Sequence, residues 1–227
     1  MIKKLAAVLA IIVGITNIGG IFAPESAYAA AAPEIIAEAG ILIDGTTGQI
    51  LYTKNENATL EPASTTKMIT CLLAIENLEM DHVVTIDDET PFTEGSRIYL
   101  LEDEQITVEN LLYALMLESA NDAAVALAKE ISGSTEAFAV KMNERAKELG
   151  ATSTNFVNPN GLHTEGHLST VHDLAMIAKG CMENETFRTL CSTYYHYIPA
   201  TNKQDERHMY NTNRLLYDEK TLVPVNG

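Results

Sequence analysis

Ser64 and Lys67 lie three residues apart in the segment Ser64-Thr65-Thr66-Lys67, just after Pro62, where an apolar pattern of helical spacing begins. In a helix this spacing puts the hydroxyl and the amine on one face, within reach of a direct hydrogen bond. A serine hydroxyl is a weak nucleophile until a neighbouring base accepts its proton. Lysine can be that base when burial and the positive end of a helix lower its pKa. The pair therefore predicts nucleophilic attack on a carbonyl, with the Ser64 N–H available to an oxyanion.

The spacing of Ser64 and Lys67 also fits an ordinary surface lysine one turn after a helix start. A chain with this many serines and lysines contains such pairs by chance. A second group of residues is needed to choose between the two interpretations.

That second group is Ser119-Ala120-Asn121, at a break between two helical stretches. A hydroxyl at such a break could pass a proton to a leaving amine, and a carboxamide could both donate to and accept from a peptide bond. The alternative is simple capping of the helix that begins at Asp122, since Ser and Asn favour such positions.

Hydrophobic periodicity predicts the elements that would position these residues. Residues 41–43 and 49–52 form a hairpin pattern around the turn 44–48, and the chain from Tyr194 onward has mixed strand and loop character. A hairpin, then helices, then extended segments indicates an α+β or mixed α/β domain. The expected helices cover residues 64–75, 107–118, 122–131, 134–149 and 171–179.

The charge of the chain excludes some partners. It holds 15 Lys and Arg against 31 Asp and Glu, a formal net charge of -16. Nucleic-acid binding and docking on an anionic lipid surface both need clustered basic side chains, so we expect neither.

Residues 1–29 have the pattern of a secretory signal. Lys3 and Lys4 precede an apolar run, and the segment ends at Ala27-Tyr28-Ala29, the small-x-small form of a cleavage site. An uncleaved membrane anchor is the alternative, but glycines and polar residues interrupt the run before it reaches the length of a bilayer span. We therefore expect an exported protein in which residues 30–38 lead into the folded domain.

The cysteines, Cys71, Cys181 and Cys191, are odd in number, so at least one thiol is unpaired. Cys71 lies in an apolar helical run and is expected to be a small buried side chain. Cys181 and Cys191 could pair outside the cell, although nothing in their spacing requires it.

Further polar residues fit structural roles better than chemical ones. His163, His167, His172 and Asp173 could be drawn as a metal cluster, but their surroundings do not favour a shared helical face, so no metal is expected. The acidic run Glu102-Asp103-Glu104 is interpreted as a solvated turn.

The order of Ser64-x-x-Lys67 and Ser119-x-Asn121 resembles the penicillin-binding, active-site-serine DD-peptidases. The surrounding sequence is most similar to their low-molecular-mass D-alanyl-D-alanine carboxypeptidases, over nearly the whole chain after the signal. The matching stretches are Ala39–Asp44, Gly48–Tyr52, Pro62–Met68, Gly95–Ser96, Leu111–Leu115, Glu118–Ala124, Asn158–Leu162, His167–Thr170, Asp173–Ala175, Asn211–Asn213 and Leu215–Leu216.

The resemblance implies an α+β (mixed α/β) fold shared with β-lactamases, with residues 39–227 as a partial catalytic domain: a helical subdomain and an incomplete antiparallel sheet. It implies that Ser64 attacks the carbonyl between the two terminal D-alanines of a peptidoglycan stem peptide. Lys67 would be the general base, Ser119 a proton relay and Asn121 a group that binds the substrate amide. Water would hydrolyse the acyl-enzyme, β-lactam antibiotics would trap the same serine, and no cofactor is required. The protein would act outside the cytoplasmic membrane, at the cell wall.

The family's third motif, Lys-Thr-Gly on an inner strand, does not occur in this chain, and Lys220-Thr221-Leu222 is the nearest string. Residues 222–227 resemble the sequence just before that strand. The motif, several sheet strands, and the tail domain and membrane anchor of relatives would then be absent. Loss of one oxyanion donor alone costs about 100-fold to 1,000-fold in rate. We therefore expect a carboxypeptidase by ancestry whose activity at this length is open.

Two other functions stay open. A β-lactamase is disfavoured because Ala120 stands where class A enzymes have Asp, and because no Glu-x-x-Leu-Asn segment follows. A catalytically inactive protein that binds penicillin or peptidoglycan fits the absence of the third motif.

In the family interpretation, His167 and Asp173 are structural residues near the cleft.

Overall fold

A computed structural model describes residues 34–218 and 223–224. The expected export signal, residues 1–29, and the first four residues of the lead-in, 30–33, lie outside this part of the chain. Residue contacts separate Met1–Ile35 from Ile36–Gly227, and every helix and strand described below belongs to the second unit.

The expected N-terminal hairpin is confirmed. Strand β1 (Gly40–Ile43) pairs antiparallel with β2 (Ile50–Lys54). The Asp44 carboxylate closes the turn by accepting hydrogen bonds from the backbone N–H groups of Thr46 and Thr47, at 3.1 and 2.6 Å.

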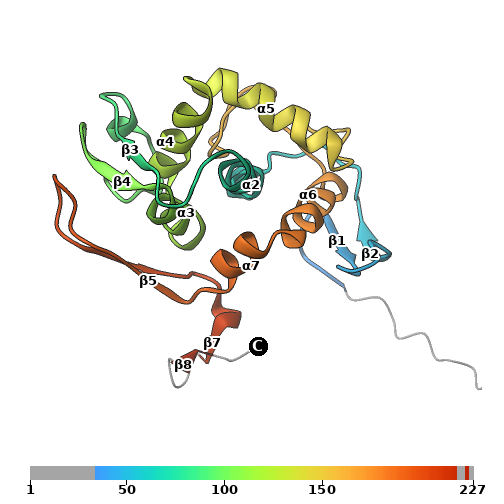
Figure 1. Ribbon diagram of the computed structural model, residues 1–227. Helices are drawn as coiled ribbons and strands as arrows, with labels where there is room; N and C mark the ends of the chain where they lie inside the picture. The colour runs from blue at the N-terminus through green and yellow to red at the C-terminus, as the bar shows by residue number, and fades with distance from the viewer. Residues whose placement is uncertain (1–33, 219–222, 225–227) are drawn as a thin grey trace, which may run out of the picture. The chain divides into compact units, whose positions relative to one another are not determined.

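Helix α2 (Lys67–Asn77) lies at the centre of the helical bundle (Figure 1). It is entered through a 3₁₀ turn, η1 (Ala63–Thr66), and packs against each of the α-helices described below. Ile69, Cys71 and Leu72 are buried on it, which confirms the burial expected for Cys71. A helix surrounded in this way is held rigidly, so the residues at its start have fixed positions.

The expected break near residue 119 separates α3 (Val108–Leu117) from α4 (Asn121–Ser132). Helix α5 (Thr135–Glu148) follows, and the Ser134 hydroxyl caps it by accepting from the N–H of Ala137 at 3.1 Å.

The helical stretch expected at 171–179 extends further, as α6 (Val171–Glu183), and a second helix, α7 (Glu185–Ser192), follows it. Sequence analysis missed α7. Asn184 ends α6 and caps α7 with its side chain, which accepts from the N–H of Phe187 at 3.1 Å. Because Asn184 is the single residue between the two helices, no loop interrupts the sequence where the first helix ends and the second begins.

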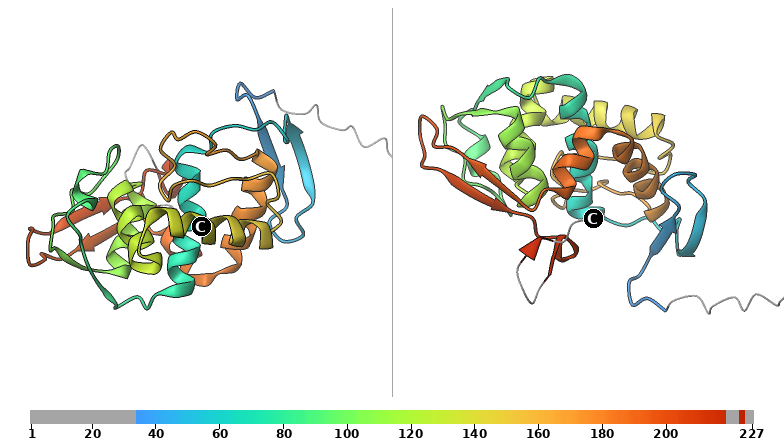
Figure 2. Two further views of the ribbon diagram at one scale, coloured as in Figure 1. Left: turned by 90° about the horizontal axis from the view of Figure 1, so that it is seen from above. Right: turned by 60° about the horizontal axis from the view of Figure 1, so that its bottom comes forward.

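Within residues 34–218 and 223–224, strands pair two by two and form no larger sheet. The N-terminal hairpin and the hairpin formed by β5 (Tyr195–Ile198) and β6 (Arg207–Tyr210) lie on opposite sides of the helices (Figure 2). This arrangement, with helices around α2 and antiparallel hairpins outside, confirms the expected mixed α+β class. The remaining elements are β3 (Val83–Thr85), η2 (Thr90–Phe92), β4 (Gln105–Thr107), η3 (Arg214–Leu216), β7 (Tyr217–Asp218) and β8 (Val223–Pro224).

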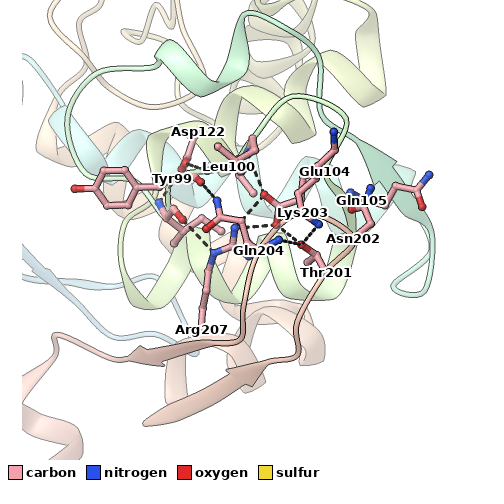
Figure 3. Close-up of polar contacts among 12 residues, drawn as sticks. Tyr99, Leu100, Glu104, Gln105, Asp122, Thr201, Asn202, Lys203, Gln204 and Arg207 are labelled. Carbon is pink, nitrogen blue, oxygen red and sulfur yellow. Dashed lines mark hydrogen bonds and ion pairs between the residues drawn. The ribbon is translucent and has the colours of Figure 1, made fainter.

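The interpretation of residues 102–104 as a solvated turn was wrong for Glu104, which is fully buried. Its carboxylate accepts two hydrogen bonds from Nη2 of Arg207, at 2.8 and 3.0 Å, and one from the Thr201 hydroxyl at 3.0 Å (Figure 3). A buried carboxylate needs such a partner to offset its lost hydration. The pair ties the β5–β6 hairpin to the loop before β4.

None of the helices in the described ranges is both long enough and apolar enough to cross a bilayer.

Candidate active site

The structure brings Ser64 and Lys67 together at the start of α2. Nζ of Lys67 lies 3.1 Å from Oγ of Ser64, a hydrogen-bond distance. The Ser64 side chain is exposed, whereas Lys67 is 3% exposed. Because Ser64 is exposed and Lys67 is buried, a ligand can reach the Ser64 hydroxyl while water has little access to the amine.

The environment of Lys67 lowers its pKa from 10.5 to about 8, and the cause is burial, which penalises the charged form. Its second hydrogen-bond partner is the backbone carbonyl of Asn160, at 2.8 Å. Lys67 forms no ion pair with any described carboxylate. An amine of this kind can accept the Ser64 proton at mildly alkaline pH.

The turn at residues 158–161 packs directly against the segment that carries the nucleophile. Gly161 has φ +85°, and a Cβ built on it would lie 1.9 Å from the carbonyl oxygen of Ala63. The Thr70 hydroxyl donates to the carbonyl of Pro159 at 2.7 Å. The turn thus fixes the Ala63–Ser64 peptide from one side and orients Lys67 through Asn160 from the other. Sequence analysis did not anticipate this contact.

Thr66 and His167 form a buried hydrogen bond one residue before the lysine, with Oγ1 and Nε2 2.9 Å apart. The backbone N–H of Val157 donates to Nδ1 of His167 at 2.9 Å, so Nδ1 carries no proton and Nε2–H donates to Thr66. Burial lowers the pKa of His167 and keeps the ring neutral. These contacts agree with the structural role expected for His167.

Ser119 lies at the junction of α3 and α4 in a left-handed conformation, with φ +56°. A non-glycine residue rarely adopts this conformation, and it occurs most often in turns and functional sites. Hydrogen bonds within the described ranges do not join Ser119 to Ser64 or Lys67. The two helices that meet at this junction, α3 and α4, both pack against α2.

Asn121 is 4% exposed and does not cap α4, whose N-cap residue is Ala120, without a capping side chain. Its backbone N–H donates to the carbonyl of Ser96, and its side-chain Nδ2 donates to the carbonyl of Glu94, each at 2.7 Å. A Cβ on Gly95 would lie 2.5 Å from that Nδ2. The amide is therefore oriented by the 94–96 loop, and its Oδ1 accepts no hydrogen bond from a described residue.

The other candidates from the sequence do not form reactive clusters. Cys71, Cys181 and Cys191 are free thiols. In the described ranges, no group of three or more His, Cys, Asp or Glu side chains is arranged to hold a metal ion. Asp173 is buried and accepts from the Ser153 N–H and the Thr154 hydroxyl, at 2.6 and 2.8 Å, which agrees with a structural role.

Comparison with known proteins matches residues 26–225 to the family described as D-alanyl-D-alanine carboxypeptidase. This chain belongs to that family. The D-alanyl-D-alanine carboxypeptidase DacF of Bacillus subtilis is 41% identical over 185 residues, which cover 79% of this chain and 47% of that protein. A D-alanyl-D-alanine carboxypeptidase of a Streptomyces strain is 36% identical over 200 residues, covering 83% of this chain and 69% of that protein.

The family's fold is also the one observed here. A crystal structure of a D-alanyl-D-alanine carboxypeptidase from Mycobacterium tuberculosis matches with a TM-score of 0.78 at 31% identity, covering 84% of this chain and 72% of that one. A variant of the Streptomyces DD-transpeptidase matches with a TM-score of 0.75 at 34% identity, covering 81% and 77%. The resemblance inferred from the sequence, in both family and fold, is confirmed. The chain spans about half the length of the Bacillus relative.

Proposed function

We propose that this chain is a serine-type D-alanyl-D-alanine carboxypeptidase that acts on peptidoglycan stem peptides through an acyl-enzyme on Ser64. The observation that carries the proposal is the exposed Ser64 hydroxyl 3.1 Å from the buried amine of Lys67. Family membership supplies the substrate class, a peptide that ends in D-alanyl-D-alanine.

In the first step, Oγ of Ser64 attacks the carbonyl carbon between the two D-alanines as neutral Lys67 accepts its proton. The backbone N–H of Ser64 has no acceptor among the described residues and can donate to the oxyanion that forms. Collapse of this intermediate breaks the C–N bond and leaves the remaining peptide esterified to Ser64.

The leaving amine of D-alanine needs a proton, and we assign its delivery to Ser119, which would relay it from Lys67. The carboxamide of Asn121 is assigned to the substrate's amide group, because its Oδ1 is free to accept while Nδ2 is held by Glu94. Water then hydrolyses the ester. The residues of this site call for no cofactor.

The same serine would be acylated by β-lactams, whose reactive amide would meet the same nucleophile. Because the substrate class is cell-wall peptide, the protein would act outside the cytoplasmic membrane, in keeping with the signal pattern of residues 1–29.

The test uses the full chain in two assays. Fluorescent penicillin should label the wild type and not Ser64→Ala, and a D-Ala-D-Ala peptide should release D-alanine at a rate that Ser64→Ala abolishes. Thr65→Ala serves as the matched control and should keep its labelling, because Thr65 is an exposed residue beside Ser64 whose hydroxyl donates to the Pro62 carbonyl and does not contact Lys67.

The two assays separate the possible outcomes. Labelling without D-alanine release would indicate a penicillin-binding protein that does not turn over peptide. Rapid hydrolysis of penicillin would indicate a β-lactamase. Absence of labelling in a folded wild type would refute the proposal.

A further inference from the structure

A cavity of about 390 Å³ lies between the loop at residues 97–99, the end of α3 and strand β6. The proposed mechanism does not use it. Its polar lining consists of Arg97, Tyr99, Glu118, Gln204, Arg207 and His208.

The cavity lies beside the second motif, although Ser119 and Asn121 do not line it. Glu118, in its wall, directly precedes Ser119 in the chain. Arg97, which also lines the cavity, directly follows Ser96, whose carbonyl accepts the N–H of Asn121 at 2.7 Å. A substrate held by Ser119 and Asn121 would therefore have this cavity as its neighbour.

The loop that carries Arg97 is rigid. The carboxylate of Asp122 accepts from the N–H groups of Ile98 and Leu100, at 3.2 and 3.1 Å, and Nε of Arg207 donates to the carbonyl of Ile98 at 3.1 Å (Figure 3). Gln204 donates its side-chain amide to the carbonyl of Tyr99. Tyr99 is held at φ +59°, a conformation that costs energy for a non-glycine residue. A loop anchored on both sides can present a side chain in a fixed place.

The charges on the cavity wall are not equally compensated. Arg207 is neutralised by Glu104. Arg97 and Glu118 form no ion pair with each other or with any other described residue. Nη1 of Arg97 donates to the carbonyl of Thr93 at 3.2 Å, which leaves other N–H groups of the guanidinium available. Oε1 of Glu118 accepts from the N–H of Tyr210 at 3.0 Å, which leaves its second oxygen available.

We propose that this cavity binds a zwitterionic amino acid group, with Arg97 holding the carboxylate and Glu118 the ammonium. Opposite charges that line one cavity without pairing match a ligand that carries both charges on one carbon. The inference rests on the proposed function, which offers two sources of that group. One is the D-alanine released by the reaction, and the other is the free end of a diamino acid in the stem peptide.

The test measures equilibrium binding of compounds that contain no bond for the enzyme to break. The first probe is N-acetyl-L-alanyl-γ-D-glutamyl-meso-diaminopimelate amide, which has one free amino acid group. The second and third are the same compound with that group acetylated on nitrogen or converted to a carboxamide. The fourth is free D-alanine, and its blocked forms are N-acetyl-D-alanine and D-alanine amide. The variants are Arg97→Gln and Glu118→Gln. Lys141→Gln and Glu144→Gln, exposed on α5, are the matched controls.

The wild type and both controls should bind a zwitterionic probe about tenfold more tightly than its blocked forms, the worth of one charge-assisted hydrogen bond. Arg97→Gln should remove the preference over the carboxamide, and Glu118→Gln the preference over the acetylated form. Binding of the tripeptide assigns the cavity to the stem peptide, and binding of D-alanine alone assigns it to the product.

Equal binding of zwitterionic and blocked probes by the wild type, no binding of any probe, or a preference that survives both substitutions would overturn the proposal. Penicillin labelling of Ser64, measured in parallel, reports on the proposed function separately. Its failure would leave the binding result unaffected.

Discussion

Gly161 and Ala63 are in such close contact that no side chain fits between them: a Cβ on Gly161 would lie 1.9 Å from the Ala63 carbonyl oxygen. These residues are far apart in the chain, and the contact locates the peptide that leads into Ser64. Gly161 therefore positions the peptide that leads into Ser64, the proposed nucleophile.

Gly161→Ala should slow acylation of Ser64 by penicillin at least tenfold, because the clash displaces the peptide before the nucleophile, and small misplacements carry large rate costs. It should also lower the free energy of unfolding by about 1–2 kcal/mol for the left-handed backbone, and further for the clash. Acylation rate and urea unfolding measure the two effects.

Gly150→Ala is the matched control for this substitution. Gly150 has φ +93° but nothing within 4 Å of an added Cβ. Gly150→Ala should lower the free energy of unfolding by the cost of the left-handed backbone alone and should leave the acylation rate unchanged. Equal acylation rates for the two variants would mean that the contact does not position Ser64.

The acylation rate of the wild type should rise with pH, with a midpoint near 8. Burial lowers the pKa of Lys67 to about 8, and only the neutral amine can accept the Ser64 proton. A penicillin whose own ionisation lies outside pH 6–10 gives the cleanest profile. A midpoint close to the ordinary lysine pKa would show that another group is the base.

The burial of Lys67 should also change how the free energy of unfolding depends on pH, which a comparison of the wild type with Lys67→Met would show. Unfolded Lys67 keeps its proton up to pH 10.5, whereas the folded protein releases it near 8. The unfolded state thus binds more protons than the folded state between pH 8 and 10.5. The free energy of unfolding of the wild type should therefore rise by about 3 kcal/mol relative to that of the variant as pH increases through this range. Urea unfolding at several pH values measures this difference. Parallel curves for the two proteins would contradict it.

Glu104→Gln should destabilise the fold by about 3–5 kcal/mol, because it leaves Arg207 buried without its charge partner. The double variant Glu104→Leu/Arg207→Met should cost less than the sum of the single changes, since no unpaired charge remains. A double-mutant cycle by urea unfolding measures the coupling.

The exposed pair of Lys129 and Glu89 provides the control for this cycle. Glu89 is 80% exposed, and Glu89→Gln should change stability by no more than about 1 kcal/mol. A cost for Glu104→Gln as small as this would mean that water reaches the buried pair.

The sequence by itself determined the local part of this protein. The pairing of Ser64 with Lys67 was predictable because helical periodicity places residues three apart on one face, whatever the rest of the chain does. The N-terminal hairpin, the break before α4 and the helix that begins near Ser134 were predictable for the same reason, since each depends on a few neighbouring residues. The order of motifs was enough to indicate the family.

The tertiary structure alone decided how Ser64 and Lys67 are positioned and how far Lys67 is buried. The carbonyl of Asn160 reaches Lys67, and Gly161 reaches Ala63, across more than ninety residues of chain. The sequence does not distinguish Glu104 from its exposed acidic neighbours, because its partner Arg207 lies on β6, far along the chain. Burial, and with it the lowered pKa of Lys67, is a property of the packed helices around α2. No spacing within one segment encodes which distant segment will exclude water from it.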